Sequence, residues 1–198
     1  MKKNDMQKYF KQKAITVLDV VLAAGALGGW AFSTFVWGGG RIGIPVFVVF
    51  AAVLGAKRSM RIKDSEFDSA LSKMYSQNDI DPESDDTITA FDYRSEVVKG
   101  RDQKLRGRYC WATKYAFHGD HAEITAWKLD VQNNETKSFT YTISQADKVE
   151  VIEENIRIAG RFKQIVHLTH PAFENPIPVT TEDVNSDKLI TRLKNGNY

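Results

Sequence analysis

The chain has 198 residues, enough for one modest domain and a membrane anchor, and its net charge of +2 conceals a strong segregation of charge. Residues 1–63 carry ten Lys or Arg against two acids, residues 64–87 carry one base against eight acids, and residues 88–198 have a net charge of only +1. The near-neutral C-terminal region argues against a nucleic-acid-binding protein, which needs a basic face, and the single cysteine, Cys110, excludes an internal disulfide.

Two apolar runs separated by a glycine-rich turn dominate the N-terminal part of the chain. The first, residues 14–37, has one charge, Asp19, and as a helix it would extend about 36 Å, more than the ~30 Å hydrocarbon core of a bilayer. The second, residues 42–56, would reach only about 22 Å, so it must recruit the preceding glycines or thin the bilayer. A cleaved signal peptide is disfavoured because the first run is too long and a second follows at once. Residues 1–63 are thus predicted to be a basic tail and a transmembrane helical hairpin, with spans at about 14–37 and 40–57.

Basic residues flank this hairpin on one side. Five lysines precede the first run and four Lys or Arg follow the second, whereas the intervening turn holds only Arg41. Segments rich in Lys and Arg remain on the cytoplasmic side of a membrane. We therefore expect a multi-pass protein of the bacterial inner membrane with both termini in the cytoplasm.

Small residues recur at intervals of four in the first run, at Gly25, Gly29 and Ser33. This spacing lets two helices approach closely. It fits packing within one hairpin, which is the simpler interpretation, and it also fits self-association of two chains. Asp19 lies about one turn inside the membrane, where it either makes a polar contact between helices or reaches the lipid headgroups.

Residues 64–87 connect the hairpin to the rest of the chain. Residues 64–77 place Phe67 and Met74 on one helical face, with acidic residues in the first turn, where the helix dipole favours them. Residues 79–86 form an acidic, proline-containing stretch that is typical of a flexible linker. A juxtamembrane helix followed by an acidic linker is the predicted order.

From residue 88 the hydrophobic period changes from helical to two, which is typical of strands. Aromatic and small residues alternate over residues 109–117, and Gly119-Asp120 then marks a hairpin turn. The repeated pattern predicts about seven antiparallel strands, followed by an amphipathic helix at residues 186–194. We therefore predict an α+β membrane protein whose β-rich domain, residues 88–198, lies in the cytoplasm.

The stretch YTISQADKVEV at residues 141–151, followed by IRIAG at residues 156–160, resembles bacterial pleckstrin-homology-like membrane proteins. Those proteins typically pair a short transmembrane hairpin with this domain, so the resemblance covers residues 105–195 and the layout of the anchor. It implies a mainly antiparallel β PH-like barrel closed by a C-terminal helix. It implies no substrate and carries no phosphoinositide-binding residues.

The four histidines form two pairs with the same spacing. His118 and His121 bracket a two-residue turn, which brings their side chains within chelating distance across a hairpin. His167 and His170 lie on a predicted strand, where residues three apart point to opposite faces. Ordinary surface histidines explain this pattern better than a zinc site, so we expect no metal and no cofactor.

A basic run at Arg101, Lys104, Arg106 and Arg108 is the main candidate for an anion-binding site. Guanidinium and ammonium groups there are suited to an anionic lipid headgroup or a nucleotide phosphate. A solvated loop accounts for the same run, because charge runs are usually solvated faces.

Motifs of catalysis are absent from the sequence: it has no Gly-rich phosphate loop after a strand, no Gly-x-Ser-x-Gly and no His-Glu-x-x-His. Cys110 lies in an alternating strand pattern typical of a small buried residue rather than a nucleophile. The favoured interpretation is a membrane-anchored, non-enzymatic binding or regulatory module with no catalytic residues. Its expected partners are membrane lipids and a protein partner or a second copy held through the transmembrane helices, but not nucleic acid.

Two alternatives belong to other functional classes. The layout is similar to two-helix, β-barrel effectors of antiphage defence, which sense a ligand such as a nucleotide and then oligomerise their transmembrane helices. A catalytic or metal-dependent domain is the other alternative, and it depends entirely on the histidines.

Overall fold

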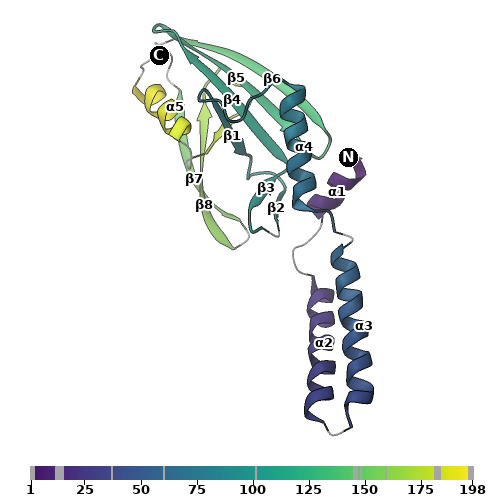
Figure 1. Cartoon of the computed structure of the whole chain (residues 1–198). Coiled ribbons are helices and arrows are strands. Elements are labelled where there is room, and N and C mark those ends of the chain that lie inside the picture. The colour runs from purple at the N-terminus through teal and green to yellow at the C-terminus, as the bar shows by residue number, and fades with distance from the viewer. Residues whose placement is uncertain are drawn as a thin grey trace. The chain divides into compact units, whose positions relative to one another are not determined.

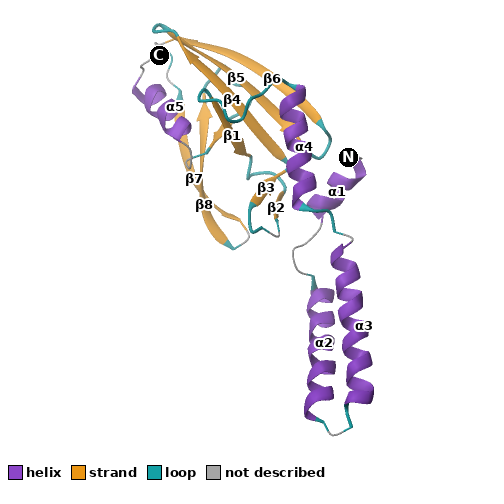
Figure 2. Cartoon of the chain, viewed as in Figure 1, coloured by secondary structure: helices purple, strands orange, loops and turns teal. Residues whose placement is uncertain are grey.

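The computed structural model is α+β, with two apolar helices near the N-terminus and antiparallel sheets after them (Figure 1, Figure 2). It comprises two compact units: a hairpin unit, Lys11–Lys63, and a sheet unit, which combines Met1–Phe10 with Asp64–Tyr198. The residues that the structure describes are 3–11, 16–36, 38–59, 61–100, 102–144, 147, 149–158, 160–180 and 184–195.

The hairpin unit consists of α2, Val17–Phe35, and α3, Gly40–Ser59. Thr16 caps α2, because its hydroxyl accepts the Asp19 amide at 3.3 Å while its own amide donates to the Asp19 carboxylate at 2.7 Å. Since α3 begins at Gly40, the second helix recruits the turn glycine and reaches 20 residues, about 30 Å. Both helices are long and apolar enough to cross a membrane. Residues 14, 15 and 37 of the predicted first span lie outside the described residues.

Asp19 makes a polar contact with the C-terminal end of the hairpin. Lys57 Nζ lies 2.9 Å from Asp19 Oδ1, and Arg61 Nη2 lies 2.7 Å from Asp19 Oδ2. The carboxylate is therefore both part of the α2 cap and the ion-pair partner of two basic residues. Of the two roles that the sequence leaves open, a contact between the helices is the one found.

The small residues at four-residue spacing in α2 face α3 of the same chain. A Cβ atom added at Gly29 would lie 2.9 Å from the carbonyl oxygen of Gly43, and one added at Gly43 would lie 2.7 Å from Cβ of Ser33. A Cβ atom at Gly25 would collide with the ring of Phe50. The two helices thus approach closely along the line of small residues, as small residues at this spacing allow.

The described strands of the sheet unit form three antiparallel sheets, with strand orders β1-β4-β5-β6, β2-β3 and β7-β8-β9. The alternating patterns of the sequence produce long, in-register ladders between β4, β5 and β6 and between β7 and β8. The strands are β1 Thr87–Phe91, β2 Val97–Lys99, β3 Leu105–Gly107, β4 Tyr109–Phe117, β5 His121–Asp130, β6 Glu135–Ser144, β7 Glu150–Ile158, β8 Arg161–Thr169 and β9 Ile177–Val179.

The four-stranded sheet is covered on both faces around β4. Successive residues point to opposite faces, so Trp111 enters a core shared with the three-stranded sheet and with α5, Val184–Asn195. Cys110 points to the other face, which is covered by α4, Asp64–Gln77, and its Sγ atom lies 3.1 Å from the hydroxyl of Tyr75. The shared core contains Ile88, Trp111, Ala122, Ile124, Ala126, Ile143, Val149, Val166, Leu168, Ile177, Val179, Leu189 and Leu193.

The sheets are not closed into the barrel that the sequence analysis expects. Within the described residues, β1 pairs only with β4, and β9 pairs only with β8, so the four-stranded and three-stranded sheets share no ladder. β9 has three residues, and its central Pro178 has no backbone N–H to donate. A short edge strand with a proline is a poor template for the ladder that would close the barrel.

An N-terminal helix, α1, Lys3–Lys11, lies in the region that the sequence analysis treats as a basic tail. Tyr9 is fully buried, and its ring stacks on the ring of Phe67 in α4 at a centroid separation of 5.2 Å. Its hydroxyl donates to Asp64 at 3.0 Å. Residues before the hairpin therefore pack against the helix that follows it.

Candidate functional site

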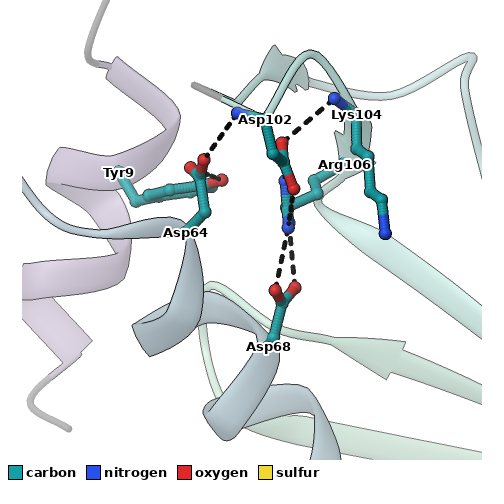
Figure 3. A network of polar contacts seen from close by, with 6 residues as sticks. All are labelled: Tyr9, Asp64, Asp68, Asp102, Lys104 and Arg106. Carbon is teal, nitrogen blue, oxygen red and sulfur yellow. Dashed lines mark hydrogen bonds and ion pairs between the residues drawn. The ribbon is translucent and has the colours of Figure 1, made fainter.

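Arg106, from the predicted anion-binding run, is buried in a network of carboxylates (Figure 3). Its Nε and Nη2 atoms donate to Asp68 of α4 at 2.9 and 2.8 Å, and its Nη1 and Nη2 atoms donate to Asp102 at 2.9 and 2.8 Å. The Asp102 amide in turn donates to Asp64, the carboxylate that Tyr9 binds. The side chain of Arg106 is only 4% exposed, so its charge is directed inward and neutralised within the protein.

The other residues of the predicted run have different environments. Arg108 donates to Asp130 through Nε and Nη2, at 3.3 and 2.9 Å. Lys104 is exposed, and Arg101 lies outside the described residues. Of the three residues of the run that the structure describes, Arg106 and Arg108 form ion pairs with carboxylates of the sheet unit, and Lys104 is exposed.

The ion pairs affect the pKa of the carboxyl groups that take part in them. Hydrogen bonds from Arg106 lower the pKa of Asp102 to about 2, because they stabilise the charged form. Asp102 also accepts a hydrogen bond from the Lys104 amide at 3.0 Å. This network holds α1, α4 and the β2-β3 hairpin together and has the geometry of a structural site.

A cavity of about 350 Å³ lies along the unpaired edge of β1, where that strand meets α4 and the β8-β9 edge of the three-stranded sheet. Its volume is at the lower end of the range for small-molecule sites. Apolar side chains from all three elements line it, and polar groups converge on it from opposite sides. The apolar residues include Leu71, Phe91, Val166 and Val179, and the polar ones include Asp68, Tyr75, Cys110, Lys163 and His167.

His167 is the polar group in this cavity that stands out. It is 2% exposed, and its Nδ1 atom has no hydrogen-bond partner among the described residues. Burial lowers the pKa of the imidazole, which favours its neutral form. A buried polar atom without a partner costs free energy, on the order of 1–3 kcal/mol. A bound molecule that supplies the partner would recover that cost.

Tyr75 and Cys110 lie on the α4 side of the same cavity and bind each other through the contact described above. Burial raises the pKa of the Cys110 thiol to about 12. The thiolate is the nucleophilic form of cysteine. At neutral pH this thiol is therefore protonated, which makes it a poor nucleophile.

The β4-β5 hairpin brings together the first pair of histidines and one carboxylate. His118 and His121 stack with ring centroids 4.7 Å apart. His118 Nε2 lies 3.7 Å from one oxygen of Glu123, and His121 Nε2 lies 4.0 Å from the other. The second pair is not part of this cluster, since His167 lies in the cavity and His170 accepts the amide of Ala172 at 3.1 Å.

Sequence reasoning missed the carboxylates that define these sites. Glu123 follows His121 by two positions on a strand, and strand residues two apart point to the same face. This spacing could have indicated Glu123 as a third ligand if carboxylates had been considered together with the histidines. Asp68 binds Arg106 from 38 residues away, and no local pattern indicates that pairing. The cavity is formed by two sheet edges and a helix, so its lining also has no local signature.

No protein-family model matches the chain, and no curated protein or solved structure matches it.

Proposed function

We propose that the chain is a membrane-anchored, non-enzymatic binding module of the bacterial inner membrane, with the cavity between β1, α4 and the β8-β9 edge as its ligand site. The observation that carries this proposal is the buried Nδ1 atom of His167, which has no hydrogen-bond partner among the described residues and lies in a cavity of about 350 Å³. Buried polar groups in proteins nearly always have partners, and a concave, mostly apolar site with a few polar groups is the usual form of a small-molecule site.

The ligand that suits the cavity is a small molecule with an apolar body and a polar group. Leu71, Phe91 and Val166 supply apolar contacts. His167, as a neutral imidazole, can donate or accept a single hydrogen bond to the ligand, depending on its tautomer. The protonated thiol of Cys110 supports binding rather than covalent catalysis.

The contacts of α1 and α4 support a two-span anchor. Tyr9 precedes the hairpin and Asp64 follows it, yet their side chains are hydrogen-bonded at 3.0 Å. A single crossing would separate these residues by the thickness of the bilayer, about 30 Å of hydrocarbon. Two crossings return the chain to the side on which it began. With the basic flanks, this supports cytoplasmic termini and a turn at residues 38–40 that faces outward.

The PH-like resemblance is part of the same proposal. The two apolar helices, the antiparallel sheets and the C-terminal helix α5 are the elements that such a protein would need. The open edge between β1 and β9 is a departure from a closed barrel, and it is the edge at which the cavity lies.

The test is to fill the cavity and measure what the full chain binds. Ala90 lines the cavity on β1 and is buried, so Ala90→Phe would occupy part of the volume. Ala116 on β4 is exposed, and Ala116→Phe is the matched control. Both variants and the parent chain are purified in mild detergent, and small molecules that remain bound are identified by native mass spectrometry. An environment-sensitive apolar dye serves as a second probe.

The proposal predicts a bound molecule, or saturable dye binding, in the parent and in Ala116→Phe, but at least tenfold weaker binding in Ala90→Phe. His167→Ala should weaken the binding of the co-purified molecule without filling the cavity. Equal binding by all four proteins, or binding by none, would refute the cavity as a ligand site. Thermal melting of each variant shows whether a loss of binding reflects unfolding instead.

A further inference from the structure

We propose that the tip of the β4-β5 hairpin is a binding site for a divalent transition-metal ion of the zinc class, with His118, His121 and Glu123 as its protein ligands. This inference is independent of the cavity and departs from the expectation, drawn from the histidines alone, that the chain holds no metal. The difference is Glu123, which turns a histidine pair into a set of three ligands.

The hairpin register explains why the three side chains meet. The amide of His118 donates to the carbonyl of His121 at 2.9 Å, which closes a two-residue turn. Gly119 occupies the first turn position with φ +90°, a conformation that glycine adopts without strain. The two histidines are thus opposite each other, and Glu123 follows on the same face because strand residues two apart point the same way. The arrangement is set by backbone hydrogen bonds rather than by the side chains themselves.

The atoms that would bind the ion already face one another. One ligand atom from each of the three residues lies within 4.8 Å of the others. The Nε2 atoms of both histidines point to the Glu123 carboxylate, at 3.7 and 4.0 Å. Zn–N and Zn–O bonds of about 2.0–2.1 Å in a tetrahedral site place ligand atoms about 3.3 Å apart. Side-chain rotations of these surface residues would bring the ligand atoms to that separation in the bound state.

Asp120 supplies the orientation that metal-binding histidines need. Its Oδ1 atom lies 2.6 Å from Nδ1 of His121. A carboxylate at Nδ1 holds the proton there and leaves the Nε2 lone pair available for a metal. Two imidazoles and one carboxylate form a ligand set that zinc sites use with a fourth position open to water. The exposure of this hairpin tip leaves that position open to solvent.

The experiment titrates ZnCl2 alone into the full chain, purified in detergent without a histidine tag and treated with chelator, by isothermal titration calorimetry. The expected result is one Zn²⁺ per chain. Affinity should fall at least tenfold in each of His118→Ala, His121→Ala and Glu123→Ala. Asp120→Asn keeps all three ligands and should weaken binding by about tenfold, as loss of a carboxylate behind a metal-binding histidine does.

His170→Ala is the matched control, because it removes a histidine that lies outside the cluster, and its affinity should equal that of the parent chain. Co²⁺ provides a second readout: its visible absorption in the parent chain should indicate a site with nitrogen and oxygen ligands and should disappear in Glu123→Ala. Since all three ligands are at the surface, the melting temperatures of the metal-free variants should match that of the parent. No saturable Zn²⁺ binding, or affinity unchanged by Glu123→Ala, would overturn the proposal.

Discussion

Removal of both carboxylates that bind Arg106 should destabilise the sheet unit far more than the two single changes suggest. In Asp68→Ala, Arg106 retains two hydrogen bonds to Asp102, and in Asp102→Ala it retains two to Asp68. The Asp68 side chain is 56% exposed and that of Asp102 is 36% exposed, so solvent screens each pair from one side. We expect each single substitution to cost about 1 kcal/mol.

The double variant should lose more stability than the two single variants together. It leaves the guanidinium of Arg106, whose side chain is 4% exposed, without either of its carboxylate partners. Breaking a buried ion pair so that one charge remains unpaired costs about 3–5 kcal/mol. The expected interaction between the two changes is therefore about 1–3 kcal/mol, well outside the ~0.5 kcal/mol within which independent sites add. Arg106→Met in the double-variant background should recover most of the loss, since a buried ion pair is often replaced by apolar groups without penalty.

The free energy of unfolding is measured by urea titration of the full chain in mild detergent, followed by tryptophan fluorescence. Hydrogen exchange of the β2-β3 hairpin assigns the loss to this part of the protein. Lys104→Ala, on the same loop but exposed, is the control and should change stability by less than about 0.5 kcal/mol. Additive effects of Asp68→Ala and Asp102→Ala would contradict the view that the two carboxylates share one buried charge.

Three further predictions concern other parts of the chain. Gly29→Leu should weaken α2–α3 packing by about 1–3 kcal/mol through overpacking, measured as faster hydrogen exchange in α2, whereas Gly28→Leu should not, because no atom lies within 4 Å of a Cβ at Gly28. Burial lowers the pKa of His167 in the folded protein, so as pH falls the His167 side chain is protonated in the unfolded chain before it is protonated in the folded one. The contribution of the buried neutral imidazole to stability is therefore present above the unfolded pKa of about 6.5 and is lost as pH falls below it. His167→Gln should flatten this part of the urea-midpoint profile, and an unchanged profile would refute the assignment. Reporter fusions after Gly40 and after Tyr198 should report the outside and the inside of the cell, and a periplasmic C-terminus would refute the cytosolic topology.

Acid provides a separate test of the Arg106 network. Hydrogen bonds from Arg106 lower the pKa of Asp102 to about 2 in the folded protein, whereas an unfolded aspartate titrates near 3.9. The stabilisation is thus fully present above about pH 4 and is lost as pH falls towards 2. Asp102→Asn should remove this part of the acid dependence of the urea midpoint. An identical acid profile in parent and variant would show that Asp102 does not carry the effect.

Features with a local signal could be predicted from the sequence. The apolar runs predict two membrane-length helices, and the change to period two predicts antiparallel strands, because burial of one face dictates each pattern. The helix over 64–77 occupies the same residues in the structure, where it buries Phe67 and Met74 on one face. The turn between His118 and His121 is likewise indicated by a glycine at a position that needs positive φ.

Features that depend on distant partners could not be predicted. The basic run resembles a solvated loop or an anion site, and nothing local distinguishes Lys104, which is exposed, from Arg106, which is buried. The two residues differ because Arg106 has a partner in Asp68 on α4, which lies 38 residues earlier in the sequence. Net charge is therefore a weak guide to surface potential here, because the same count of basic residues describes a cationic patch and an internally neutralised network.

The N-terminal residues also make a contact that no local sequence pattern predicts. A short lysine-containing segment has no pattern that predicts docking, yet Tyr9 is fully buried against Phe67, and its hydroxyl binds Asp64. The sheet unit thus holds the residue just before the hairpin and the residue just after it within one hydrogen bond of each other. If α2 and α3 cross a membrane as proposed, a segment inserted between two such fixed points must leave and return on the same side, so this contact outside the apolar helices favours an even number of crossings. Tyr9→Ala would remove the ring stacking and the hydrogen bond of Tyr9 without changing a residue of either apolar helix, whereas the packing of Phe10 on Phe67 would remain.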